Sequence, residues 1–88
     1  MRRDEKRRCR DMLEYIILKL GRAKYTNILQ HANFNVTGLN KYIDLLKGKN
    51  YIQLIGKNEY KITQEGIKFF IDISVMIRYE DIQFGGLE

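Results

Sequence analysis

The sequence of 88 residues has few of the side chains on which catalysis and metal binding depend. It contains one cysteine, one histidine and no proline, and its single serine, Ser74, lies among apolar residues. His31 has no Cys/His cluster at metal-ligand spacing around it. No glycine-rich run precedes a helix, so the phosphate-binding loop of nucleotide enzymes is missing. We therefore expect no enzyme, no metal site and no cofactor.

Three further absences bear on location. Cys9 has no partner for an internal disulfide, which is typical of an intracellular protein. The N-terminus is charged and lacks the apolar segment of a signal peptide. The apolar run at residues 15–18 is too short to cross a bilayer. These features predict a protein that is located in the cytoplasm and does not bind or cross a membrane.

The composition predicts one small domain with a lean core, since 44% of the residues are hydrophobic. The net charge is +5 and the isoelectric point is about 9.4, which favours a polyanionic partner or an anionic membrane surface. The charge is uneven: residues 1–10 carry +4, residues 11–49 carry +3, and residues 67–88 carry −2. Nucleic acid is therefore expected at the N-terminal half.

The sequence pattern of residues 26–52 predicts two helices joined by a tight turn. A short helix over 26–32 would be capped by Thr26 or Asn27, and residues 33–35 would form the turn. A longer helix over 36–49 would be capped by Asn35. Its apolar residues recur at steps of three and four, which places them on one face: Val36, Leu39, Tyr42, Ile43 and Leu46. The opposite face is polar: Thr37, Asn40, Lys41, Asp44 and Lys47.

A small hairpin is predicted directly after this helix pair, with strands at 51–55 and 60–63 around a turn at 56–59. A preceding helix begins at Asp4 or Asp11, runs to Leu20 and is stopped by Gly21. A last helix begins after the capping residue Thr63 and ends at about Tyr79 or Ile82. The order predicts a mostly α protein with a small β-hairpin wing (α+β), in which a winged helix-turn-helix is followed by a long C-terminal helix.

The segments LNKYIDLLKGKNYI at 39–52 and YKITQEG at 60–66 resemble the small archaeal winged-helix DNA-binding regulators. In that family a recognition helix ends in a Lys-Gly-Leu-Ile-like segment, and a Tyr-x-Leu-Thr-x-x-Gly-like segment leads from the wing into the last helix. The resemblance covers residues 13–77 and departs at Asn50, where the family usually has glycine. Asparagine also tolerates the left-handed conformation required there. The resemblance implies a short strand near 21–25 that pairs with the wing.

We divide the chain into a basic N-terminal arm (1–10), a winged helix-turn-helix domain (11–66), a C-terminal dimerisation helix (67–84) and a tail (85–88). The arm is either a phosphate-contacting segment or a disordered, solubilising end.

The predicted DNA-binding residues form three groups. Thr37, Asn40 and Lys41 are base-edge candidates near the start of the recognition helix, where an asparagine can pair with adenine in two hydrogen bonds. Gly38 either lets the backbone approach DNA or is simply tolerated near the helix start. The wing contributes Lys57, Asn58 and Lys61. The phosphate candidates are Arg7, Arg8, Arg10, Lys24 and Lys47.

The last helix has two apolar stripes, and a small domain can cover only one of them. We expect the stripe that contains Ile67, Phe70, Ile71 and Ile77 to face the core. The second stripe, Phe69, Ile73 and Met76, would then form a homodimer interface. The two assignments could be reversed.

The sequence thus predicts a protein that binds double-stranded DNA as a homodimer, as a transcriptional regulator does. The main alternative is a winged-helix interaction module of a larger complex, because a fold does not fix a function. A second alternative is double-stranded RNA binding.

Overall fold

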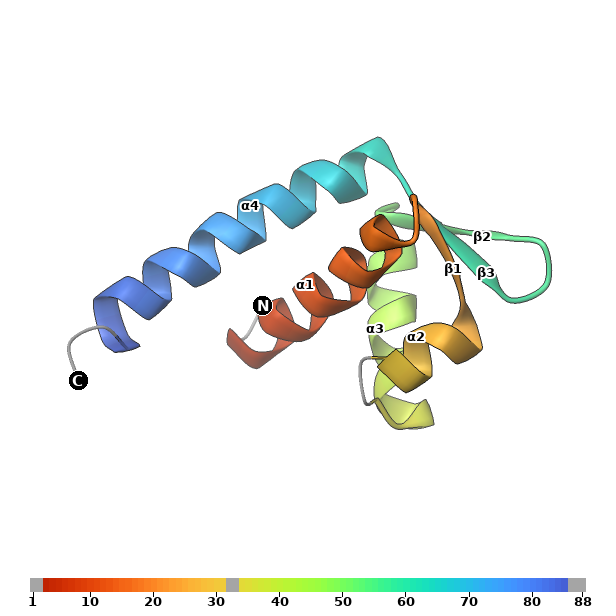
Figure 1. The fold of residues 1–88 in the computed structure, drawn as a ribbon, viewed down its shortest axis with the longest axis horizontal. Coiled ribbons are helices and arrows are strands. Elements are labelled where there is room, and N and C mark those ends of the chain that lie inside the picture. Colours follow the sequence, from red (N-terminus) through yellow and green to blue (C-terminus); the bar gives the residue numbers. More distant parts are fainter. Residues whose placement is uncertain (1–2, 32–33, 86–88) are drawn as a thin grey trace.

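The computed structural model describes residues 3–31 and 34–85 (Figure 1). Its elements follow the chain in this order: α1 (Arg3–Leu18), β1 (Arg22–Lys24), α2 (Tyr25–His31), α3 (Val36–Gly48), β2 (Ile52–Ile55), β3 (Glu59–Ile62), α4 (Gln64–Glu80) and a short π-helical turn, η1 (Asp81–Gly85). The predicted elements are all present, and most of the boundaries lie within two residues of expectation.

Helix α1 begins at Arg3, so residues 3–10 of the expected basic arm are part of the domain. Its buried stripe already includes Cys9 and continues through Met12, Leu13 and Ile16. The helix ends at Leu18. Leu20 and Gly21 have positive φ angles of 64° and 97°, and the Gly21 N–H donates to the Ile16 carbonyl over 3.0 Å. The helix therefore ends two residues before the predicted Leu20, which is itself left-handed and 97% exposed, and Gly21 lies directly after it.

Helices α2 and α3 form the predicted helix-turn-helix. Helix α2 begins at Tyr25, so neither Thr26 nor Asn27 is its N-cap. The expected helix end at Ala32 and the turn residue Asn33 lie outside the described residues. Asn35 caps α3 as predicted, because its Oδ1 accepts from the Gly38 N–H over 2.6 Å.

The inner face of α3 carries Leu39, Ile43 and Leu46, which are all buried, while Tyr42 is partly buried. The expectation for Val36 was wrong, since this side chain is 54% exposed. It lies in the first turn of the helix, at the edge of the core.

Three antiparallel strands form one sheet in the order β1-β3-β2. Ala23 and Leu54 both lie opposite Tyr60, on the two sides of the central strand. The short strand that the resemblance implied before the helix-turn-helix is therefore confirmed. Asn50, between α3 and β2, has a φ angle of 62°, as expected for the position that departs from the family pattern. The fold is a winged helix-turn-helix.

The start of α4 is held against the segment that connects α3 to β2. Thr63 is the predicted N-cap: its Oγ1 accepts from the Gly66 N–H over 2.9 Å and donates to the Asn50 carbonyl over 2.7 Å. A Cβ at Gly66 would lie only 2.1 Å from the Tyr51 carbonyl oxygen. The Tyr51 ring also stacks on Phe69, with centroids 4.2 Å apart. These contacts fix the rotation of α4 about its own axis.

That rotation reverses most of the predicted stripe assignment. Ile73 and Ile77 are 3% and 1% exposed, and Phe69 packs against the core. The expectation that Phe69 and Ile73 lie outward was therefore wrong, as was the expectation that Ile67 and Ile71 face the core. Met76 is 48% exposed, and Ile77 is buried as predicted.

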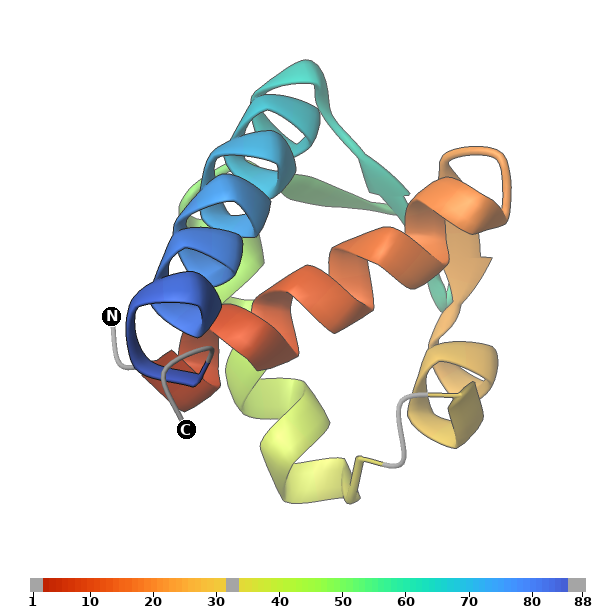
Figure 2. The ribbon, with the colours of Figure 1, turned by 60° about the vertical axis from the view of Figure 1, so that its left-hand side comes forward.

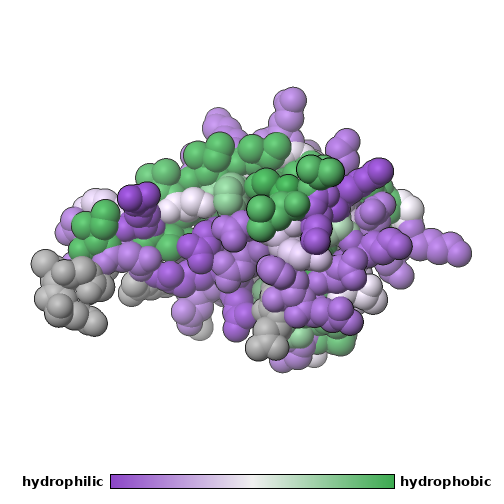
Figure 3. Space-filling model, in the orientation of Figure 1, coloured by the Kyte–Doolittle hydropathy of each residue, from purple (hydrophilic) through white to green (hydrophobic). Residues whose placement is uncertain are grey.

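The outward face of α4 carries a row of apolar side chains along its length. Figure 3 shows hydrophobic surface along the edge of the molecule that α4 forms. Steps of four and three residues place its members on one side of the helix. We name this surface the outer stripe: Ile67, Ile71, Val75 and Tyr79 of α4 and Ile82 of the following η1, with exposed fractions of 43–63%.

Helices α1 and α4 lie side by side and antiparallel (Figures 1 and 2). Ion pairs join the start of α1 to the end of α4, from Lys6 to Glu80 and from Arg7 to Asp81. These contacts between distant parts of the chain explain why the predicted arm is helical.

Candidate nucleic-acid interface

The solvent face of α3 presents polar side chains, as the pattern predicts. Thr37, Asn40 and Lys47 are exposed, and Asp44 lies on the same face. Gly38 is half-buried, and a Cβ there would lie 3.1 Å from the Asn35 Oδ1 atom. The glycine therefore makes room for the helix cap, which gives it a structural role beside the predicted role of admitting DNA.

Tyr25 connects three parts of the fold: α2, α3 and the wing. Its hydroxyl donates to the Asn40 Oδ1 atom on α3 over 2.9 Å, and its backbone N–H donates to the Asn58 carbonyl at the wing tip over 2.7 Å. Tyr25 itself begins α2. The position of Asn40 is therefore tied to that of the wing, an arrangement that the sequence analysis missed.

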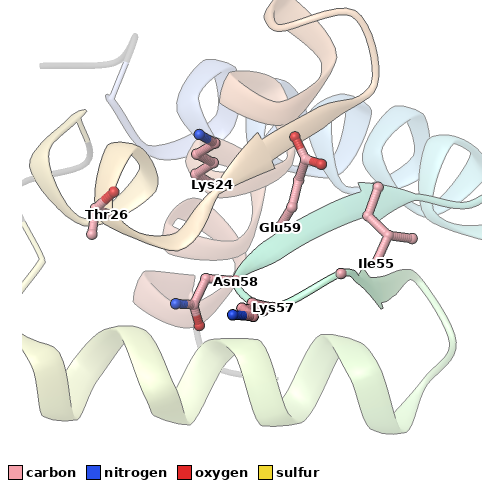
Figure 4. A pocket seen from close by; sticks show the side chains of 7 residues that line it. Lys24, Thr26, Ile55, Lys57, Asn58 and Glu59 are labelled. Atoms are coloured by element: carbon pink, nitrogen blue, oxygen red, sulfur yellow. The ribbon is translucent and has the colours of Figure 1, made fainter.

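The wing tip and the start of α2 enclose a shallow pocket of about 350 Å³ (Figure 4). Lys24 of β1, Thr26 of α2, and Lys57 and Asn58 of the wing line it together with Ile55, Gly56 and Glu59. The structure thus brings three of the predicted DNA-binding residues together: Lys24, Lys57 and Asn58. Glu59 introduces one negative charge among them.

Lys61 lies on β3, two residues after the start of the strand at Glu59, and its side chain is exposed. The strand register places it opposite Arg22 of β1. Arg22 is also exposed and was not among the predicted residues. The pairing of β1 with β3 identifies Arg22, because it places Arg22 and Lys61 side by side on the sheet.

Three arginines of α1 have partners within the protein. Arg7 pairs with Asp81, Arg10 pairs with Asp11 over 3.0 Å, and the Arg8 guanidinium lies 5.1 Å from the centre of the Phe34 ring. Figure 1 shows that the end of α1 nearest to the wing is its C-terminal end and that its start lies away from the wing. The structure does not bring these predicted phosphate contacts to the wing side.

Lys41 also differs from its neighbours on α3. Its Nζ atom lies 3.6 Å from a Glu5 carboxylate oxygen and 5.5 Å from the centre of the Tyr42 ring. It therefore faces the α1 flank of α3, while Asn40 faces Tyr25. The structure therefore does not place the Lys41 side chain beside Asn40.

Tyr60 lies at the back of this region. Burial raises the pKa of its hydroxyl, and the neighbouring Tyr25 and Asp44 raise it further. Tyr60 therefore remains neutral at physiological pH.

No cluster of three or more His, Cys, Asp or Glu side chains suited to a metal ion occurs in residues 3–31 and 34–85. His31 is exposed and stacks on Tyr15, with ring centroids 4.2 Å apart. Within the same described ranges, no helix has the length and apolarity that crossing a membrane requires.

Comparison with known proteins gives two matches. A family model described as winged helix-turn-helix matches residues 2–81. Among solved structures, Sso10a-2, a DNA-binding protein from Sulfolobus solfataricus, is similar with a TM-score of 0.74 and 18% sequence identity. The match covers 89% of this chain and 85% of that one. At this identity, the likeness shows a shared fold. Comparison with curated protein sequences gives no significant match.

Proposed function

Since the chain belongs to the winged helix-turn-helix family, we propose that it binds double-stranded DNA in a sequence-specific manner, as a homodimeric transcriptional regulator. Recognition helix α3 would enter the major groove, and the wing would contact the backbone or the minor groove beside it. The similarity to Sso10a-2, itself described as DNA-binding, supports this proposal.

The observation that carries the proposal is the arrangement around Tyr25. One residue joins the start of α2, the exposed Asn40 of α3 and the wing tip through two hydrogen bonds. The exposed cations Lys24, Lys47 and Lys57 lie on these same parts of the fold. A polar helix face with cations on both the helix and the wing suits a duplex, because phosphate contacts orient the protein and base contacts supply specificity.

The polar and basic residues of this region divide into three groups. Lys24, Lys47, Lys57 and Lys61 are the proposed phosphate contacts. Asn40 and Thr37 are the proposed base contacts. Arg7 and Arg8 connect α1 to Asp81 and Phe34, while Arg10 pairs with its neighbour Asp11 within α1, so all three have partners in the protein.

The proposed dimer is formed by the outer stripe, not by Phe69, Ile73 and Met76 as a set. Its five side chains are 43–63% exposed in one copy, and a monomer would leave this row of apolar groups in water. A second copy related by a two-fold axis presents the same row, so the two stripes are complementary and the assembly is closed. Two recognition helices would then contact two half-sites of a palindromic operator.

Competition binding tests the proposal. The protein should bind a random duplex DNA in low salt, prefer sequences selected from a random library over that duplex, and bind an A-form RNA duplex less well. If it binds no duplex at any salt concentration, the proposal fails and the interaction-module alternative takes its place. Sedimentation at micromolar concentration tests the dimer separately, and a monomer there would refute it.

A further inference from the structure

The side-chain amide of Asn40 is held in place before any DNA arrives. The Tyr25 hydroxyl lies 2.9 Å from the Asn40 Oδ1 atom and donates to it. Asn40 itself is exposed on α3, so without this bond its amide would be free to rotate. The hydrogen bond therefore selects one orientation of the amide, with the NH₂ group directed away from Tyr25.

Tyr25 is itself fixed from two sides. Its ring is partly buried against the hydrophobic core, and its backbone N–H donates to the Asn58 carbonyl over 2.7 Å. It also directly follows β1, whose register with β3 is set by the pair of Ala23 and Tyr60. The hydroxyl is thus positioned by the sheet and the wing and does not need to reorganise when Asn40 meets a base.

The consequence for base recognition follows from the hydrogen-bonding groups in the major groove. An asparagine that uses both Oδ1 and NH₂ pairs with adenine, which presents the N7 acceptor and the N6 donor. Guanine presents two acceptors, N7 and O6, and no donor. An Asn40 whose Oδ1 atom is engaged by Tyr25 offers mainly its NH₂ donors, which match guanine.

We infer that Tyr25 is a specificity-determining residue, which positions Asn40 as a hydrogen-bond donor so that the protein prefers guanine over adenine at one base pair of each half-site. The inference rests on the proposed DNA binding and specifies what its recognition helix reads. Tyr25 contacts no base in this account, and it acts through Asn40 alone.

Selection of bound sites from a random duplex library tests the inference. Four proteins are compared at the same salt concentration: the unmodified protein (the parent), Tyr25→Phe, Asn40→Ala and the control Tyr42→Phe. Tyr42 lies on the other flank of α3, where its ring packs near Phe34, so its substitution removes a hydroxyl without touching Asn40. The parent should prefer guanine at one position, and Asn40→Ala should lose that preference. Tyr25→Phe should shift it toward adenine by roughly 2- to 12-fold, the value of one hydrogen bond. Tyr42→Phe should select the parent sequence.

A second measurement uses the selected site with the guanine N7 atom replaced by carbon. This change should weaken the parent by a similar factor and leave Asn40→Ala unaffected, while affinity for random duplex stays constant for all variants. The inference is overturned if the parent prefers adenine at the Asn40-dependent position, if Tyr25→Phe selects the parent sequence, or if Asn40→Ala changes no base preference. In each of these cases duplex binding persists and the proposed DNA binding stands, although an unchanged preference of Asn40→Ala would remove Asn40 from its base contacts. Loss of all duplex binding by the parent would refute both.

Discussion

The substitution Ile71→Glu should convert the proposed dimer into folded monomers. Ile71 lies in the middle of the outer stripe and is 55% exposed in one copy. A glutamate there faces solvent in the monomer and has no reason to disturb the fold. In the dimer the same carboxylate would lie in an apolar interface, opposite a second stripe.

The expected size of the effect follows from the exposed fraction. Full burial of an isoleucine is worth about 1.5–3 kcal/mol, so covering the exposed half recovers about 1 kcal/mol in each copy. A symmetric dimer loses this twice, or about 2 kcal/mol, before the cost of desolvating the carboxylates is added. The dimer dissociation constant should therefore rise by at least about 30-fold.

Analytical ultracentrifugation across a concentration series measures this shift, and circular dichroism verifies the fold. The matched control is Ile73→Glu, two residues along the same helix. Ile73 is 3% exposed, so a glutamate there introduces a charge into the core and should unfold the protein. The outer stripe is not the interface if the dimer of Ile71→Glu has the same dissociation constant as the unmodified dimer, or if Ile73→Glu folds normally and is the variant that becomes monomeric.

Two further predictions concern stability. Gly66→Ala should destabilise the protein by at least about 1–3 kcal/mol, because the new Cβ would lie 2.1 Å from the Tyr51 carbonyl oxygen. Gly48→Ala on α3 should stabilise the protein by up to about 1 kcal/mol, because a Cβ there meets no neighbouring atom within 4 Å. Equal effects of the two substitutions in urea denaturation would contradict this packing. Burial raises the pKa of the Cys9 thiol from 9.0 to about 12, with a smaller contribution from Glu5. The unfolded chain therefore loses this proton near pH 9 while the folded chain retains it, so the stability of the parent relative to Cys9→Ala should be constant below pH 9 and decrease between pH 9 and 12. A relative stability that stays constant up to pH 12 would show that the thiol is not protected.

The local signals of the sequence predicted the fold well, because each depends on a few neighbouring residues. Asn35 and Thr63 both cap helices through side-chain oxygens, and Asn50 adopts the left-handed conformation. The strand near residue 23 and its pairing with the wing were likewise predicted, from the resemblance. Such features follow from hydrogen-bonding and steric preferences that act within a few residues.

The rotation of α4 could not be predicted in this way. The helix has apolar residues on both sides, so periodicity alone does not identify the inner one. The choice is made by contacts with a distant segment: Gly66 against the Tyr51 backbone, and Phe69 against the Tyr51 ring. The helical start of α1 also depends on distant partners, since Lys6 and Arg7 pair with residues at the end of α4.

The candidate site was predicted in part. The exposed polar face of α3 and the cations of the wing followed from pattern and resemblance, and the structure brings Lys24, Lys57 and Asn58 together. The hydrogen bond between Tyr25 and Asn40 had no signal in the sequence, because it joins two helices across a turn. The arginines of residues 1–10 were overvalued as DNA contacts, since their charge was visible while their intramolecular partners were not.

The dependence of duplex affinity on salt tests the central proposal most directly. If Lys24, Lys47, Lys57 and Lys61 each neutralise one phosphate, a plot of log K against log salt concentration should have a slope of about −3.6 per protomer and about −7 for the dimer. Lys47→Gln should make the dimer slope less steep by about 2, while Arg10→Gln, which removes a cation paired with Asp11, should leave it unchanged. An affinity that is constant between low and physiological salt would contradict DNA binding by this surface.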